Sequence, residues 1–275
     1  MIMQILRHAF NVIKHHKLLF SFIILLQLLF FSSLGASLYT YSQEVVGSLN
    51  AVSNYLNSQE WLKTNPTEEN LRELGIPSTD PEFIASEREK MLIATQMFFL
   101  KAGEAYILFC GLAWLLSYRM MHKHSIKELL NVYGKFVVVS LPYLAALSLL
   151  LYSLAVMITG QFLTLNAAQT YLFVLPLFFV FFLLYFMPVS FALVPATPLK
   201  ESVQQTLRIG IRKCLFLFSM YGGALLLIGG LAVGMLLVME RSFLLSVFFG
   251  VTVLICITLF RILLLAGISL PEKES

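Results

Sequence analysis

The chain has 275 residues, of which 59% are hydrophobic and only 12% are charged. A soluble domain carries about 25% charged residues, so this chain has too little polar surface to cover itself in water. Its net charge of +4 is small and dispersed, which argues against a nucleic-acid partner. The composition therefore predicts an integral membrane protein whose first partners are membrane lipids.

Six apolar runs are each long enough to cross a membrane, because a hydrocarbon core about 30 Å thick needs roughly 20 helical residues. Backbone groups in lipid must bond within their own segment, so these runs are predicted to be helices. The predicted spans are residues 18–41, 102–120, 136–159, 170–194, 215–239 and 242–265. The fold class is therefore all-α, a polytopic membrane bundle of six transmembrane helices. The first run is longer than the roughly 7–15 residues of a signal-peptide core, so we expect an uncleaved span.

The basic residues gather in segments that alternate along the chain, and this alternation predicts the orientation of the spans. They occur in residues 1–17, around 121–135 and in 195–214, whereas the short loop 160–169 carries no charge. Basic loops stay in the cytoplasm. We therefore predict a multi-pass protein of the cell membrane with a cytoplasmic N-terminus and a cytoplasmic tail, residues 266–275. The clustered residues are Arg7, Lys14 and Lys17; Arg119, Lys123, Lys127 and Lys135; and Lys200, Arg208, Arg212 and Lys213.

A similar amphipathic stretch precedes each odd-numbered span, in residues 6–12, 126–132 and 199–205. Each opens with an aliphatic and a basic residue, and then alternates apolar and polar positions at helical spacing. We predict short amphipathic helices that lie in the cytoplasmic interface with their apolar faces toward the membrane. The chain would then consist of three units, each an interfacial helix followed by a hairpin of two spans. The alternative is that any basic linker between spans acquires this pattern.

The third of these stretches carries a family resemblance. Span four contains Pro188, Pro195-Ala196-Thr197-Pro198 ends it, Leu199-Lys200-Glu201-Ser202 follows, and span five contains Tyr221-Gly222-Gly223. The pattern resembles six-span families of uncharacterised bacterial and archaeal membrane proteins. It is also similar to the membrane domain attached to some glycerophosphodiester phosphodiesterases. The resemblance runs from Tyr185 to Val238 and implies a topology, but no phosphodiesterase catalytic domain is present, so it implies no such activity.

Residues 42–101 form the one large segment predicted outside the membrane, and this segment is acidic. Val45, Leu49, Val52 and Leu56 recur at helical spacing, which predicts that span one continues outward as an amphipathic helix. Pro66 to Gly75 is predicted to form a short helix. From Pro81 nothing breaks a helix before Met120, so its predicted length is about 60 Å. This extracytoplasmic helical cap either packs on itself or holds another membrane or extracytoplasmic protein.

Few residues within the spans suggest a site. Lys101 and Glu104 lie one turn apart and are expected to pair at the outer interface. Arg261 lies near the inner end of span six, where it reaches lipid phosphates or a neighbouring helix. Gly230 and Gly234 form a GxxxG step, which lets helices pack closely within the bundle or in a homo-oligomer.

No motif points to catalysis, so we expect no catalytic residues, no cofactor and no enzyme activity. His122 and His124 have no carboxylate or cysteine at ligand spacing, so we expect no metal site. The function we favour is a non-enzymatic accessory or scaffold protein. The alternative is a transporter or channel for a small or hydrophobic solute, since Pro142, Pro176 and Pro188 interrupt spans three and four.

Overall fold

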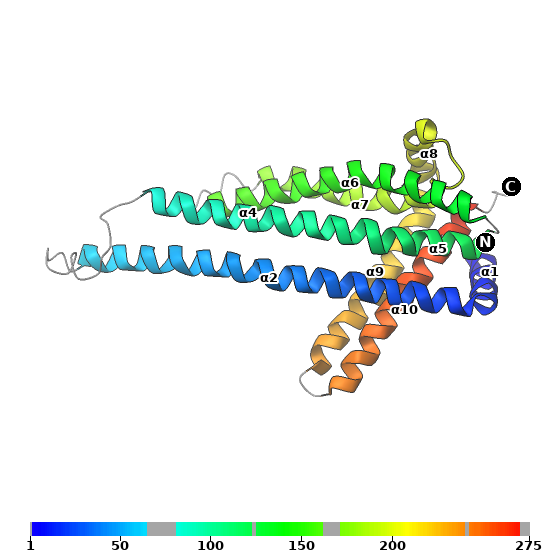
Figure 1. The fold of residues 1–275 in the computed structure, drawn as a ribbon, viewed down its shortest axis with the longest axis horizontal. Coiled ribbons are helices and arrows are strands. Elements are labelled where there is room, and N and C mark those ends of the chain that lie inside the picture. The colour runs from blue at the N-terminus through cyan, green and yellow to red at the C-terminus, as the bar shows by residue number, and fades with distance from the viewer. Residues whose placement is uncertain (1, 65–80, 123–124, 162–170, 240–241, 270–275) are drawn as a thin grey trace. The chain divides into compact units, whose positions relative to one another are not determined.

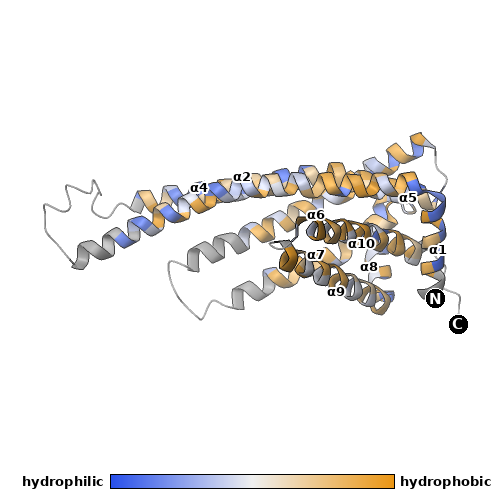
Figure 2. Ribbon diagram, turned by 90° about the horizontal axis from the view of Figure 1, so that it is seen from below, coloured by the Kyte–Doolittle hydropathy of each residue, from blue (hydrophilic) through white to orange (hydrophobic). Residues whose placement is uncertain are grey.

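The computed structural model describes residues 2–64, 81–122, 125–161, 171–239 and 242–269, and every regular element in them is helical. Among these residues, six helices are long and apolar enough to cross a membrane, which confirms the predicted all-α class and a multi-pass membrane protein. Figure 1 shows the elements, and Figure 2 shows that apolar residues extend along the whole of α9 and α10. The elements are α1 (Ile2–His15), α2 (Lys17–Thr64), α4 (Pro81–Ala105), the π-helical turn η1 (Tyr106–Cys110), α5 (Gly111–Met121), α6 (Ile126–Gln161), α7 (Tyr171–Leu193), α8 (Leu199–Arg212), α9 (Cys214–Met239) and α10 (Phe243–Ser269).

The chain divides into two compact units. The first, which we call the bundle, contains residues 1–32, 105–145 and 181–275. The second contains residues 33–104 and 146–180. The predicted short helix at Pro66 to Gly75, most of the loop 160–169 and the hairpin tip 240–241 lie outside the described residues.

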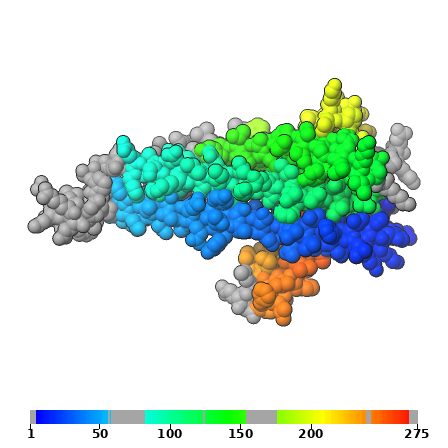
Figure 3. Space-filling view, in the orientation of Figure 1, coloured from blue at the N-terminus to red at the C-terminus, as the bar shows by residue number. Residues whose placement is uncertain are grey.

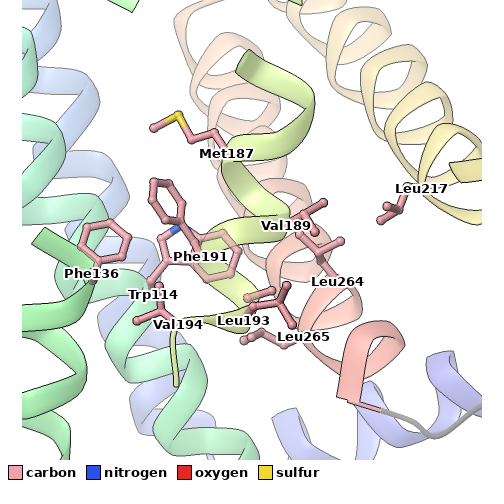
Figure 4. Close-up of a cluster of buried hydrophobic side chains, with 11 residues drawn as sticks. Trp114, Phe136, Met187, Val189, Phe191, Leu193, Val194, Leu217, Leu264 and Leu265 are labelled. Atoms are coloured by element: carbon pink, nitrogen blue, oxygen red, sulfur yellow. The ribbon is translucent and has the colours of Figure 1, made fainter. Parts of the chain in front are cut away.

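Two apolar clusters hold the bundle together. One contains Trp114, Phe136, Phe191, Leu217 and Leu264, which come from five different helices and are drawn in Figure 4. The other contains Ala9, Ile23, Ala113 and Ile262 and ties α1 to α2, α5 and α10. The bundle is therefore closed by side chains from segments that are far apart in the sequence.

In the second unit, α2 and α4 lie side by side as an antiparallel pair, which we call the arm (residues 42–64 of α2 and 81–101 of α4). The rings of Tyr55 and Phe83 lie 5.1 Å apart. Closer to the spans, the Ser48 hydroxyl donates a hydrogen bond to Glu87, and both residues are buried. Figure 3 shows the surfaces of α2 and α4 in contact along the arm.

The face by which α2 packs includes Val45 and Val52 of the predicted face but not Leu49. Val45, Ser48, Val52 and Tyr55 are buried or half-buried, whereas Leu49 is 49% exposed. Their alternating spacing of three and four residues is that of a two-stranded coiled coil. The sequence pattern favoured Leu49 because it is apolar, but the small polar Ser48 is the residue that accommodates and bonds Glu87.

The amphipathic stretches follow a threefold pattern of burial. Position by position, residues 6–14 and 126–134 are exposed, half-buried and buried in the same order, and residues 199–207 differ only at Thr206. Each amphipathic stretch packs on the second span of another predicted repeat. Ile5, next to the first stretch, approaches Gly267 of α10. Tyr133 donates a hydrogen bond to the Ile107 carbonyl at 3.2 Å, and Tyr185 of α7 donates one to the Gly210 carbonyl of α8 at 2.8 Å.

One detail of the predicted pattern is wrong. Residues 126–132 are not a separate interfacial helix but the first turns of α6, which runs to Gln161. Ser125 and Glu128 cap that helix reciprocally, and Gly134 alone does not break it, since one glycine costs only about 1 kcal/mol.

Candidate functional site

Arg261 is the charged side chain of the sixth span, and the structure buries it inside the bundle. It lies on α10 roughly 12 Å from the end of the helix at Ser269. Only 6% of its surface is exposed. Its guanidinium carbon lies 5.3 Å from the centre of the Trp114 ring on α5. The negative face of an indole attracts a cation, so Trp114 holds the charge at this depth.

Two hydrogen-bond donors in this part of the bundle have no partner among the described residues. They are Nη1 of Arg261 and Nε2 of Gln27 on α2, and both atoms are buried. The amide oxygen of Gln27 accepts a hydrogen bond from Thr258 Oγ1 at 3.1 Å. Thr258 lies one turn before Arg261 on α10, so α10 presents both residues toward α2 and α5. A buried donor without a partner costs about 1–3 kcal/mol.

No carboxylate of the spans balances the Arg261 charge. The six predicted spans contain no aspartate, and their one glutamate is Glu104 at the start of the second. In the structure Glu104 is 2.8 Å from Lys101 Nζ. Intramembrane charges normally pair with one another or face a water-filled cavity, so Arg261 is an exception that a function would explain.

The π-helical turn η1 lies beside this arginine. Its first residue, Tyr106, has ring contacts with Phe30 of α2 and Phe191 of α7, each at 6.1 Å between centroids. Phe191 in turn contacts Trp114 at 5.8 Å, as Figure 4 shows. Such turns insert one residue into an α-helix and are frequent at functional sites. The inserted residue turns the face of the preceding helix by roughly 100° relative to α5.

The space around these aromatic rings is nearly full. A cavity of about 10 Å³ lies next to Trp114 and is lined mainly by apolar and aromatic side chains, among them Tyr133, Phe136 and Phe191. That volume holds at most about one water molecule, and a water needs two to four polar partners. The arrangement can therefore hold a fixed positive charge in a dry, aromatic surrounding.

The other predicted site residues are Lys101, Glu104, Gly230 and Gly234. Lys101 and Glu104 belong to the second unit, and their side chains are about half exposed. A Cβ at Gly234 would meet Phe249 of α10 at 3.2 Å, so this glycine packs within the α9–α10 hairpin. A Cβ at Gly230 would meet nothing within 4 Å. The GxxxG step thus has one residue at a helix contact and one facing open space.

The described residues contain no group of three or more potential metal ligands. His124 lies outside them. Trp114 and Tyr106 were not singled out from the sequence, although Tyr106, Cys110 and Trp114 recur every four residues. That spacing is the signal that could have placed an aromatic face opposite Arg261.

Comparisons with protein-family models, with curated proteins and with solved structures found no match for this chain. The resemblance to six-span families and to the phosphodiesterase-linked membrane domain therefore gains no support. The six apolar helices establish an integral, multi-pass membrane protein.

Proposed function

We propose that this chain is a non-enzymatic accessory or scaffold protein of the cell membrane, which binds another membrane or extracytoplasmic protein through the arm. The observation that carries the proposal is the length of the paired helices. α2 has 48 residues and is therefore about 72 Å long, more than twice the hydrocarbon thickness. Its outer part pairs with α4 and presents a long, largely exposed surface beyond the membrane.

The orientation in this proposal places the arm outside the cytoplasm. The basic residues cluster before α2, between α5 and α6, and around α8, and the positive-inside rule puts these segments and both termini in the cytoplasm. Cysteine substitutions at exposed positions test this directly. Ser42→Cys on the arm should react with a membrane-impermeant maleimide in intact cells, whereas Asn11→Cys should react only after lysis.

The interior of the bundle supports an accessory role over transport. Two of its buried hydroxyls donate to carbonyls of their own helix: Ser117 to Ala113 and Ser140 to Phe136, each at 2.7 Å. Hydroxyl groups used in this way line no polar path. The apolar cavity beside Trp114 is too small to admit a solute, so it does not favour the transporter alternative.

Site-specific photocrosslinking in native membranes tests partner binding. The crosslinking amino acid is placed at Leu49 or Met97, which are exposed on the arm, and in the control at Leu226, which is 80% exposed on α9. We expect discrete protein adducts of constant mass from the arm positions and lipid adducts from α9. The proposal is wrong if the arm positions give no protein adduct, or if position 226 gives the same one.

A further inference from the structure

α1 is an amphipathic helix with three distinct sides. Ile5 and Ala9 are buried against the bundle, with 3% and 1% exposed. The next apolar positions around the helix, Leu6 and Phe10, are 37% and 61% exposed. Beyond them lies Arg7, which is also exposed. At 100° per residue, the order around the helix is a bundle side, an exposed apolar side and a basic polar side.

α8 repeats this arrangement. Its bundle side is small and polar, with Thr206 only 2% exposed. Its apolar side is open: Val203 is 72% and Ile211 is 68% exposed. Lys200 and Arg208 are exposed beside these apolar residues. An apolar surface turned away from the protein, on a helix with a basic side, is typical of a helix that lies on a membrane surface.

The connections to the following spans are also equivalent. α1 joins α2 through His16, and α8 joins α9 through Lys213, each a single residue between two helices. The backbone N–H of His16 donates to Val12 at 3.1 Å, and that of Lys213 donates to Ile209 at 2.8 Å. In Figure 1, α1 runs crosswise to α2. Such a bend allows a helix to lie in the interface while the next one enters the bilayer.

Specific bonds fix which side of α8 faces outward. Tyr185 of α7 donates to the Gly210 carbonyl at 2.8 Å, and Ser190 Oγ donates to Thr206 Oγ1 at 3.2 Å. Lys213 Nζ donates to the Gly267 carbonyl at 3.1 Å, near the end of α10. Because these bonds hold the polar side of α8 against the bundle, its apolar side faces away from the protein. The membrane is the apolar phase that can cover this side.

We propose that the outer sides of α1 and α8 are two equivalent binding surfaces for anionic phospholipids. Leu6 and Phe10 on α1, like Val203 on α8, contact the acyl chains, and the adjacent Arg7 and Arg208 bind the headgroup phosphates. The charges are complementary, since basic residues next to a membrane surface attract anionic lipids. The acid of the α8 polar side, Glu201, accepts a hydrogen bond from Gln205 at 3.2 Å. This inference is independent of the accessory role.

The test measures which lipids stay with the purified full-length chain. The chain is reconstituted into vesicles of equal parts phosphatidylglycerol and phosphatidylcholine, extracted in mild detergent and purified, and the retained lipids are quantified by mass spectrometry. We expect phosphatidylglycerol to be retained in excess. Arg7→Gln/Arg208→Gln should lower the phosphatidylglycerol-to-phosphatidylcholine ratio at least fivefold, since each basic residue contributes about fivefold in affinity.

Two further variants separate lipid binding from altered folding. Lys90→Gln/Lys101→Gln removes the same charge from the arm and should leave the ratio unchanged. Arg7→Lys/Arg208→Lys keeps the charge and should keep the preference. Equal retention of the two lipids by the unmodified chain would overturn the proposal. So would an unchanged ratio in the glutamine variant, or an equal fall in the arm variant.

Discussion

Replacing Arg261 with methionine should stabilise the bundle. A charged residue at the centre of a membrane helix costs about 2.5–3.5 kcal/mol, and Arg261 lies between the centre and the end of α10. The contact with the Trp114 ring, 5.3 Å from the guanidinium carbon, offsets about 0.5–2 kcal/mol of this cost. Nη1 remains buried without a partner. Exchanging an unpaired buried charge for an apolar side chain of similar length should therefore raise the free energy of unfolding by about 1–2 kcal/mol.

The assay is reversible unfolding in mixed detergent micelles, followed by circular dichroism. Leu264→Met is the matched control, because it exchanges a fully buried residue on the same helix for one of similar volume and should cost less than about 1.5 kcal/mol. A double-mutant cycle with Trp114→Leu should give a coupling of about 0.5–2 kcal/mol between ring and charge. Destabilisation of more than about 1 kcal/mol by Arg261→Met would refute the reasoning, since it would mean that the guanidinium has a partner.

Two other pairs of substitutions test the packing and the polar contacts of the bundle. Gly210→Ala should lower the free energy of unfolding by about 1–3 kcal/mol, because its Cβ would clash with the Phe186 ring. Gly229→Ala, whose Cβ would meet nothing within 4 Å, should raise it by up to about 1 kcal/mol, and thermal unfolding distinguishes the two signs. Thr258→Val should lower the free energy of unfolding by about 1–3 kcal/mol, because it leaves the Gln27 amide without its hydrogen bond. Gln27→Leu should leave the free energy of unfolding unchanged or raise it, because the Thr258 hydroxyl also donates to a carbonyl of its own helix. Equal destabilisation by the last two would contradict this account.

The sequence predicts the helices well because the bilayer leaves few alternatives. An uncharged run of about 20 apolar residues has to be a helix, whatever it packs against. The long helix that starts at Pro81 follows from the same logic, because no proline or glycine pair interrupts it. The π-helical turn within it was not predicted, since an inserted residue depends on contacts with other helices, here those of Tyr106 with Phe30 and Phe191.

The register of the third amphipathic stretch shows a different limit. Residues four apart on a helix point almost the same way, so Leu199 and Val203 look equally suitable as the counterpart of Leu6. Burial does not separate them, because Ser202 and Thr206, one turn apart on α8, are both buried on the bundle side. Sequence periodicity fixes the face of an amphipathic helix, but the turn at which it docks depends on its partner.

Arg261 illustrates why the site was only partly predictable. Its position in an apolar run marked it as unusual, and the expectation was that it reaches a lipid phosphate or a neighbouring helix. The structure places it over Trp114, with Gln27 and Thr258 nearby. These residues come from α2, α5 and α10, which are brought together by packing of the whole bundle. No local sequence pattern predicts contacts between residues so far apart in the chain.

A charge that destabilises the fold persists only where it is useful, because stabilising apolar substitutions are readily available to a membrane helix. Stability and binding measured together therefore separate the roles of Arg261. If Arg261→Met raises stability and abolishes the photocrosslinked adduct at Leu49, the arginine contributes to partner binding. If stability rises and the adduct remains, the charge acts elsewhere, and the bundle is a site of function separate from the arm.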